Sequence, residues 1–233
     1  MATSSAVIIG AGSGLSASLA RKLAARGHAV VLGARNTEKL ADLTAETGAR
    51  AVAMDGSNPA EMAALFADLP APVRIAIYNP SARQRGPLTE LDPEEVRRAV
   101  EVTAFGAFLM GQQAAMRMLS NPEVDGSKGT ILFTGASAGV KGFPQSAPFA
   151  MGKFAQRGLA QSMSRELHPQ GVHVAWVNID GGISNPDRPG RVDDGTDKML
   201  HPDAIADSYL ALIDQHRSAW SEELNLRPWV ERF

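Results

Sequence analysis

The chain has 233 residues, no cysteine and a formal net charge of −2, with 44% hydrophobic and 21% charged residues. This composition is that of a globular protein large enough to fold without disulfide or metal support. It excludes cysteine-based zinc sites and thiol nucleophiles, and its charge gives no general attraction to nucleic acid or anionic membranes. No apolar run reaches the roughly 18–20 residues of a membrane span, and residues 1–5 do not resemble a signal peptide. We expect a cytoplasmic protein without a metal site.

Short apolar strands and helices are predicted to alternate along almost the whole chain. Strands are expected at residues 6–9, 29–32, 51–54, 74–78, 130–134 and 172–177, with a candidate edge strand at 224–227. Helices are expected at residues 15–26, 38–47, 59–69, 93–119, 148–167 and 202–219. This alternation predicts one α/β domain, residues 1–233, built on a parallel sheet that helices cover on both faces. Residues 181–199, rich in Gly, Pro, Asp and Asn, are either a solvated loop or a mobile lid.

A glycine-rich turn joins the first predicted strand to the first helix. It reads Gly10-Ala11-Gly12-Ser13-Gly14-Leu15-Ser16. Glycines here let the backbone approach a pyrophosphate, whose charge the helix N-terminus stabilises. Tight strand–helix turns also need glycine for steric reasons alone, but this position in an alternating chain favours a dinucleotide. We predict that the cofactor contacts Gly10, Gly12, Ser13, Gly14 and Leu15.

The end of the second strand is where a dinucleotide fold contacts the adenosine ribose, and an acidic residue there accepts hydrogen bonds from a free 2′-hydroxyl. Here the chain reads Gly33-Ala34-Arg35-Asn36, with no acidic residue before Glu38. Arg35 suits a 2′-phosphate, so NADP is expected in preference to NAD. The alternative is that Arg35 is a solvated surface side chain.

Taken together, these motifs resemble the short-chain dehydrogenase/reductase family over nearly the whole chain. The glycine turn resembles the family's TGxxxGxG, with Ile9 in place of Thr and Ser16 in place of the last Gly. The resemblance implies that Asp55 contacts adenine, that the backbone of Asn79 lies near the adenine ribose, and that Ile183 faces the nicotinamide carboxamide. It also implies a Rossmann-type, doubly wound parallel sheet of about seven strands, and a homodimer or homotetramer joined through the helices at 93–119 and 148–167.

The family's catalytic group contains a Ser, a Tyr, a Lys four residues after the Tyr, and an Asn on the preceding long helix. The i, i+4 spacing places the Tyr and Lys side chains on one helical face. In this chain Lys153 is present, but Phe149 stands at the Tyr position. The family spacing puts the Ser position at Ala136 and the Asn position at Thr103. Phenylalanine has no proton to give, and a positioned acid contributes about 10²–10⁴-fold in rate, so ordinary carbonyl reduction by the family's relay is not expected.

Several residues are candidates for the altered site. The resemblance implies that Lys153 donates to the nicotinamide ribose. Ser137 either hydrogen-bonds a substrate or caps a turn, and Asp180 is either a substrate-side acid or a turn former. Tyr78 ends a predicted strand near the expected cofactor, and Tyr209 is expected to pack on the last helix. Apolar side chains predict an apolar pocket mouth: Phe143, Phe149, Met151 and Phe154.

The sequence therefore predicts an NADP(H)-dependent oxidoreductase with an atypical active site, acting on a small apolar carbonyl, enone, imine or quinone. An enone, imine or quinone can accept a hydride while water or a nearby polar group handles the proton. The alternative is a catalytically silent NADP-binding sensor or support subunit. A third interpretation is an isomerase, lyase or hydrolase without net redox change. Consumption of NADPH separates the first interpretation from the other two.

Overall fold

The seven predicted strands form one parallel sheet. The computed structural model describes residues 4–185 and 187–231. The strands are β1 (Ser5–Ile9), β2 (Ala29–Ala34), β3 (Arg50–Ala53), β4 (Val73–Tyr78), β5 (Gly129–Thr134), β6 (Val172–Ile179) and β9 (Glu223–Leu226). They lie in the order β3-β2-β1-β4-β5-β6-β9, and every neighbouring pair is parallel. The strand order reverses between β1 and β4, which makes the sheet a doubly wound, Rossmann-type one.

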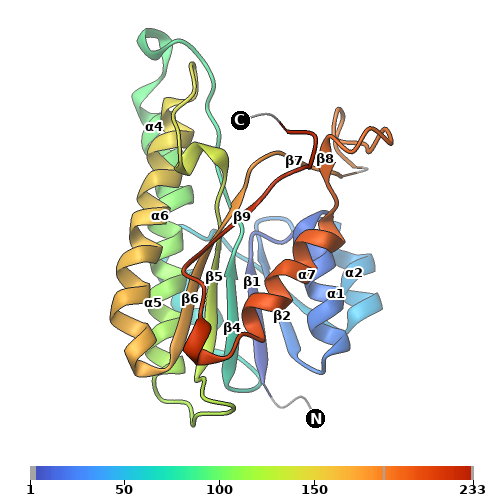
Figure 1. Cartoon of the computed structure of the whole chain (residues 1–233), viewed down its shortest axis with the longest axis vertical. Coiled ribbons are helices and arrows are strands. Elements are labelled where there is room, and N and C mark those ends of the chain that lie inside the picture. The colour runs from blue at the N-terminus through green and yellow to red at the C-terminus, as the bar shows by residue number, and fades with distance from the viewer. Residues whose placement is uncertain (1–3, 186, 232–233) are drawn as a thin grey trace.

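Helices cover both faces of this sheet (Figure 1). The first face carries α1 (Leu15–Ala25), α2 (Ala41–Thr47) and α7 (Pro202–Ile213). The second face carries α3 (Pro59–Ala67), α5 (Gly106–Met118) and α6 (Ala147–Leu167), and α4 (Pro93–Val100) packs against α6. Each helix between consecutive parallel strands is the crossover that such a pair requires.

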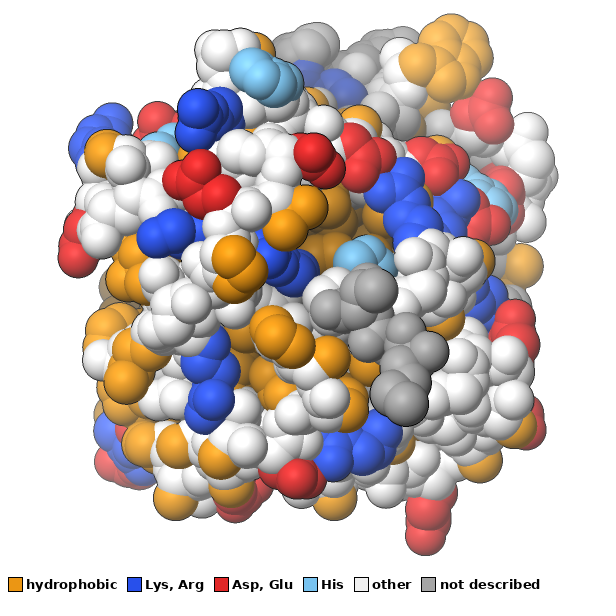
Figure 2. Space-filling view, turned by 90° about the horizontal axis from the view of Figure 1, so that it is seen from below, with side chains coloured by type: hydrophobic (Ala, Val, Ile, Leu, Met, Phe, Trp, Pro, Cys, Tyr) orange, Lys and Arg blue, Asp and Glu red, His pale blue; other side chains and the backbone are white. Residues whose placement is uncertain are grey.

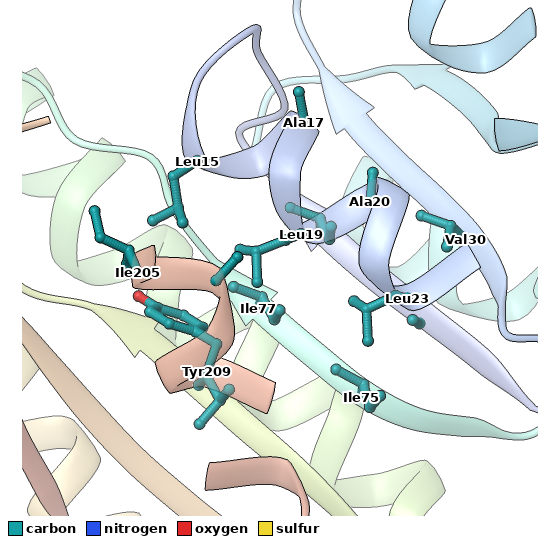
Figure 3. Packing of buried hydrophobic residues seen from close by; sticks show 14 of the residues in the cluster. Leu15, Ala17, Leu19, Ala20, Leu23, Val30, Ile75, Ile77, Ile205 and Tyr209 are labelled. Atoms are coloured by element: carbon teal, nitrogen blue, oxygen red, sulfur yellow. The ribbon is translucent and has the colours of Figure 1, made fainter. Parts of the chain in front are cut away.

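Alternate strand residues fill two apolar cores, because successive side chains of a strand point to opposite faces. On β1, Ala6 and Ile8 belong to the core under α1, and Val7 and Ile9 belong to the core under α5. Figure 3 shows the first core, where leucines of α1 point toward Ile205 and Tyr209 of α7 and toward β4: Leu15, Leu19 and Leu23. Tyr209 is buried there, as the sequence predicted, and its hydroxyl lies 2.8 Å from Thr134 Oγ1.

The predicted helix at residues 93–119 is not continuous. A π-helical turn at Glu101–Phe105 separates α4 from α5. The buried Tyr78 hydroxyl donates a 2.5 Å hydrogen bond to the Val102 carbonyl in this turn, and a Cβ at Gly106 would overlap that hydroxyl. The break therefore depends on a side chain from a neighbouring strand, which the apolar period along the helix does not reveal. The last helix also ends early, at Ile213 rather than residue 219, because the chain turns back there to form β9.

The irregular segment at residues 181–199 is tied together at its ends. Its first residues form β7 (Gly182–Ile183), which pairs with β8 (Met199–Leu200) at the end of the segment. The described residues between them contain no helix or strand. Within residues 4–185 and 187–231, no helix combines the length and apolar character that crossing a bilayer requires.

Candidate active site

A large cleft opens at the carboxyl ends of β2, β1, β4 and β5, where the strand order reverses. Its volume is about 1230 Å³, and residues that follow these four strands line it. Ligands of doubly wound sheets bind at such switch points. The opposite end of the sheet, seen in Figure 2, presents acidic and basic side chains interspersed with apolar ones. A smaller cavity of about 380 Å³, beside His168 and Trp220, contains none of the residues predicted for the site.

Most of the predicted site residues meet in the large cleft. Those that line it are Gly10, Gly12, Ser13, Gly14, Leu15, Arg35, Asp55, Asn79, Phe149, Lys153 and Ile183. Ser137 and Asp180 do not line it. The carbonyl of Ser137 accepts hydrogen bonds from the next turn, and Asp180 pairs with Arg227 at 3.1 Å. Contact of either residue with a substrate stays a prediction.

The glycine turn has the shape and the free donors that a pyrophosphate requires. A Cβ at Gly12 would meet nothing within 4 Å, so protein packing does not demand the glycine, and the space belongs to the cleft. Gly10 has a φ of +81°, and a Cβ there would lie 2.7 Å from Pro80 Cγ, so that glycine is required by the protein itself. Helix α1 begins beside the cleft with Gly14 at its N-cap and no side-chain cap. Its N-terminal N–H groups are available to an anion, and the turn fits a dinucleotide.

Two basic side chains line the cleft where β2 ends. One is Arg35, and the other is Lys39, which the sequence analysis did not single out. Lys39 follows Arg35 by four residues, and this spacing was the feature of the sequence that could have identified it. Asp55 lies on the same side, where its Oδ1 accepts hydrogen bonds from the Ser57 N–H at 2.9 Å and the Ser57 hydroxyl at 2.6 Å. These bonds, with Arg35 and Arg98 nearby, lower the pKa of Asp55 and keep it ionised.

Lys153 is buried at the floor of the cleft and is held by a chain of polar contacts. Its Nζ donates to the Thr134 carbonyl at 2.5 Å and to Gln156 Oε1 at 3.2 Å. The amide of Gln156 in turn donates to the Thr103 carbonyl at 3.2 Å, so Gln156 bridges Lys153 to Thr103. Burial, and secondarily the charge of Arg83, lowers the pKa of Lys153 to about 7. Gln156 was missed, although its i+3 spacing from Lys153 placed both on one helical face.

Phe149 has a cation against its ring. The guanidinium carbon of Arg83 lies 4.1 Å from the ring centroid, within the range of a cation–π contact. Nothing in the local sequence marked Arg83, because it sits in an irregular loop after β4 and meets Phe149 through the fold alone.

The apolar mouth predicted from four side chains is reduced to Phe149. Phe143, Met151 and Phe154 do not line the cleft, and each is about half exposed. Met151 and Phe154 follow Phe149 by two and five residues, which turns them to the opposite side of α6. The same cleft contains several arginines instead: Arg35, Arg83, Arg188 and Arg191.

Both tyrosine hydroxyls are hydrogen-bonded within the protein, and Tyr78 also lines the cleft. Tyr78 is buried with its hydroxyl on the Val102 carbonyl, and Tyr209 is buried beside Thr134. Burial raises the pKa of both hydroxyls. Both therefore serve the fold as neutral, hydrogen-bonded groups.

Comparison with known proteins agrees with this geometry. A family model described as short chain dehydrogenase matches residues 4–186. The structure of a short-chain dehydrogenase from Rhodopseudomonas palustris is 36% identical, with a TM-score of 0.79 over 97% of this chain and 99% of that one. A metagenomic short-chain oxidoreductase solved with NADP is 26% identical, with a TM-score of 0.81 over 99% of this chain and 100% of that one.

A curated relative shares the same region of sequence. The very-long-chain 3-oxoacyl-CoA reductase of Meyerozyma guilliermondii is 31% identical over 185 residues, which is 74% of this chain and 54% of the reductase. The chain thus spans about half the length of that relative.

Proposed function

The chain belongs to the short-chain dehydrogenase/reductase family, and we propose that it is an NADP(H)-dependent oxidoreductase that works without the family's tyrosine. Its family and its relatives make it an oxidoreductase that uses a nicotinamide cofactor. One observation carries the proposal: Lys153 and the uncapped glycine turn line the same cleft, while Phe149 occupies the Tyr position. One nucleotide-binding domain, residues 1–233, is part of the proposal, supported by the single seven-stranded sheet.

The preference for NADP over NAD rests on Arg35 and Lys39. Both line the cleft at the end of β2, where no acidic residue precedes Glu38 to bind a free ribose 2′-hydroxyl. Two cations at this position suit a phosphate, which a single guanidinium can grip with two parallel hydrogen bonds. Asp55, Asn79 and Ile183 line the same cleft, which supports the adenine, ribose and carboxamide contacts proposed for them.

The reaction that we propose depends on which side chains of the site can donate or accept a proton. A bound nicotinamide cofactor supplies or accepts the hydride. Phe149 gives no proton, and both tyrosine hydroxyls are buried in hydrogen bonds. With a pKa of about 7, Lys153 Nζ exists in both protonation states near neutral pH and can release a proton there. Substrates that demand little of a protein acid fit best: an enone, imine, quinone or activated carbonyl with an apolar body against Phe149.

Thermal unfolding with cofactor tests this proposal first. We expect NADPH at about 100 times its Kd to stabilise the protein by roughly 2.7 kcal/mol. For this chain length that is a rise of about 5–10 °C in Tm. NADH should give less, and the double variant Arg35→Gln, Lys39→Gln should lose the difference between the two. NADPH should then be consumed with an enone, imine or quinone. No shift with either cofactor would contradict the proposal.

A catalytically silent NADP-binding protein is the second candidate. Ala136 and Phe149, at the family's Ser and Tyr positions, form a small apolar cluster with Ala138. Lys153 Nζ is also bonded to two groups of the protein itself. Tight NADPH binding with no oxidation over a panel of enones, imines and quinones would favour this candidate.

We also propose a homodimer or homotetramer. Apolar side chains are exposed along the helical layer that the family resemblance assigns to the subunit interface: Phe105, Phe108, Met116, Met151 and Phe154. An apolar helical surface of this kind supports association between copies of the chain.

A further inference from the structure

We propose that the substrate carries a carboxylate and that Arg83, seated on Phe149, binds it. The inference rests on the proposed function, because it assumes that the substrate meets the nicotinamide beside Phe149. It goes further by assigning a charge to the substrate and a residue that recognises it.

The cleft is far more basic than the chain as a whole. The chain carries a net charge of −2, yet five exposed or half-buried cations line this one cavity: Arg35, Lys39, Arg83, Arg188 and Arg191. Its acidic lining consists of Asp55, whose carboxylate is bonded to Ser57, and Asp187. Composition does not explain this concentration of positive charge, whereas an anionic occupant does.

Among the described residues, the arginines that the loop after β4 and the segment after β7 contribute to the cleft have no carboxylate partner. Among the residues that the structure describes, Arg83, Arg188 and Arg191 make no ion pair, although Asp187 is close in sequence. Several arginines elsewhere are paired, as in Arg26–Asp214 and Arg157–Glu223, although among the described residues Arg85, Arg98 and Arg117 make no ion pair either. The unpaired cations also face one another: besides burial, the charges of Arg191, Arg85 and Arg188 lower the pKa of Arg83. A bound anion would relieve this repulsion.

The other cations of the cleft lie on different segments from Arg83, nearer the places where the phosphates of a bound cofactor would lie. Arg35 and Lys39 lie at the end of β2, where a 2′-phosphate would bind. Arg188 and Arg191 belong to the segment that reaches over the glycine turn, where Ser13 Oγ donates to Asn185 Oδ1 at 3.4 Å. Arg83 instead comes from the loop after β4 and contacts Phe149, one helical turn before Lys153. It therefore stands at the substrate end.

The contact with Phe149 holds the Arg83 guanidinium beside the cleft. At 4.1 Å from the ring centroid, the group is held by a cation–π interaction while the residue stays accessible to solvent. A guanidinium presents its N–H donors in a fixed fork that matches a carboxylate, and it does not give up its proton. Arg83 is thus suited to hold an anion and not to act as an acid. In this proposal the ring of Phe149 positions the Arg83 guanidinium.

A matched pair of ligands tests the inference. trans-3-Benzoylacrylate is an enone with a carboxylate, and its methyl ester has the same body without the charge. Calorimetry measures the affinity of each ligand for the free protein and for the NADP⁺-saturated protein. Steady-state kinetics with NADPH then gives kcat and KM for each ligand. We expect the acid to bind at least about tenfold more tightly than the ester, because hydrogen bonds to charged groups are among the strongest.

Variants then assign the effect to Arg83. Arg83→Gln should weaken acid binding about ten- to hundredfold and change ester binding less than about threefold, with NADP⁺ affinity unchanged. Arg83→Lys should recover part of the loss, since it restores charge without the fork. Arg85→Gln is the matched control: it removes a neighbouring cation that does not line the cleft, and it should leave the preference for the acid intact.

The outcomes separate this inference from the proposed function. If NADP⁺ does not bind, the proposed function fails, and the acid–ester comparison on the free protein still decides the anion site. Equal affinity for acid and ester overturns the inference. So does an Arg83→Gln variant that weakens NADP⁺ binding, because Arg83 would then serve a cofactor phosphate, or one that weakens both ligands equally.

Discussion

At the scale of single residues, we propose that the site differs from the family's pattern at the atoms that move protons. Phe149, which we assign to the family's tyrosine position, has a ring without the hydroxyl, and the guanidinium carbon of Arg83 lies 4.1 Å from the centroid of that ring. Lys153 keeps its position but is buried, with Nζ on the Thr134 carbonyl and on Gln156. In our proposal, Lys153 handles the proton and Arg83 recognises the charge of the substrate.

Replacing Phe149 restores the missing proton donor. Phe149→Tyr should add NADPH-dependent reduction of simple ketones, because its hydroxyl would lie in the cleft that Lys153 lines. A positioned acid contributes about 10²–10⁴-fold, so ketone reduction should rise by at least about tenfold over a low background. Phe154→Tyr is the matched control, because it adds the same hydroxyl to the same helix outside the cleft. Equal ketone reduction by the two variants would show that proton donation is not what the site lacks.

Burial of Lys153 makes stability depend on pH. Its pKa is about 7 in the folded protein, against about 10.4 in an unfolded chain. Between these values the unfolded state binds more protons, so stability rises with pH, and below pH 7 the cost of burying the charge is present in full.

Chemical unfolding of the wild type and Lys153→Met at pH 7 and pH 9 measures this contribution. Between the two, the wild type should gain on the order of 2 kcal/mol more than the variant. Subtracting the variant removes the other titrating groups from the comparison. Parallel pH profiles would mean that Lys153 stays charged throughout this range.

At the scale of elements, the strands followed from the sequence more closely than the helices. Each predicted strand overlaps an observed one, with ends that differ by no more than two residues. A buried parallel strand is a short apolar run bounded by polar or turn-forming residues, so the sequence shows where it begins and ends. The helix at 93–119 shows the opposite case, because the π-helical turn at Glu101–Phe105 depends on Tyr78 from β4.

Gly106 is where this turn tolerates no side chain. A Cβ there would overlap the Tyr78 hydroxyl and lie 2.6 Å from the Gly56 carbonyl oxygen, which is backbone. Gly106→Ala should therefore destabilise the protein by about 1–3 kcal/mol in a denaturant titration. Gly158→Ala in α6 is the control, since its Cβ meets nothing within 4 Å, and it should stabilise by up to about 1 kcal/mol. If both variants were stabilising, the close approach at the π-helical turn would be disproved.

At the scale of the whole molecule, the order of the strands determines where the candidate site residues come together. The reversal between β1 and β4 opens the cleft between loops that lie far apart in the sequence. The glycine turn, Arg83 and Lys153 come from three different crossovers and meet only there. Five exposed or half-buried cations and the buried Lys153 collect in one cleft of a chain whose net charge is −2, so the anionic character that we propose for the substrate follows from the fold.

The sequence alone determined the alternating α/β architecture, the glycine turn, the spacing of Phe149 and Lys153, and the family. These features are local, since each depends on residues within about two helical turns, where periodicity and spacing act directly. Only the tertiary structure decided that Arg83 sits on Phe149, that Gln156 joins Lys153 to Thr103, and that both tyrosine hydroxyls are used internally. Contacts between residues distant in sequence are fixed by how the crossovers pack, and no local pattern encodes them.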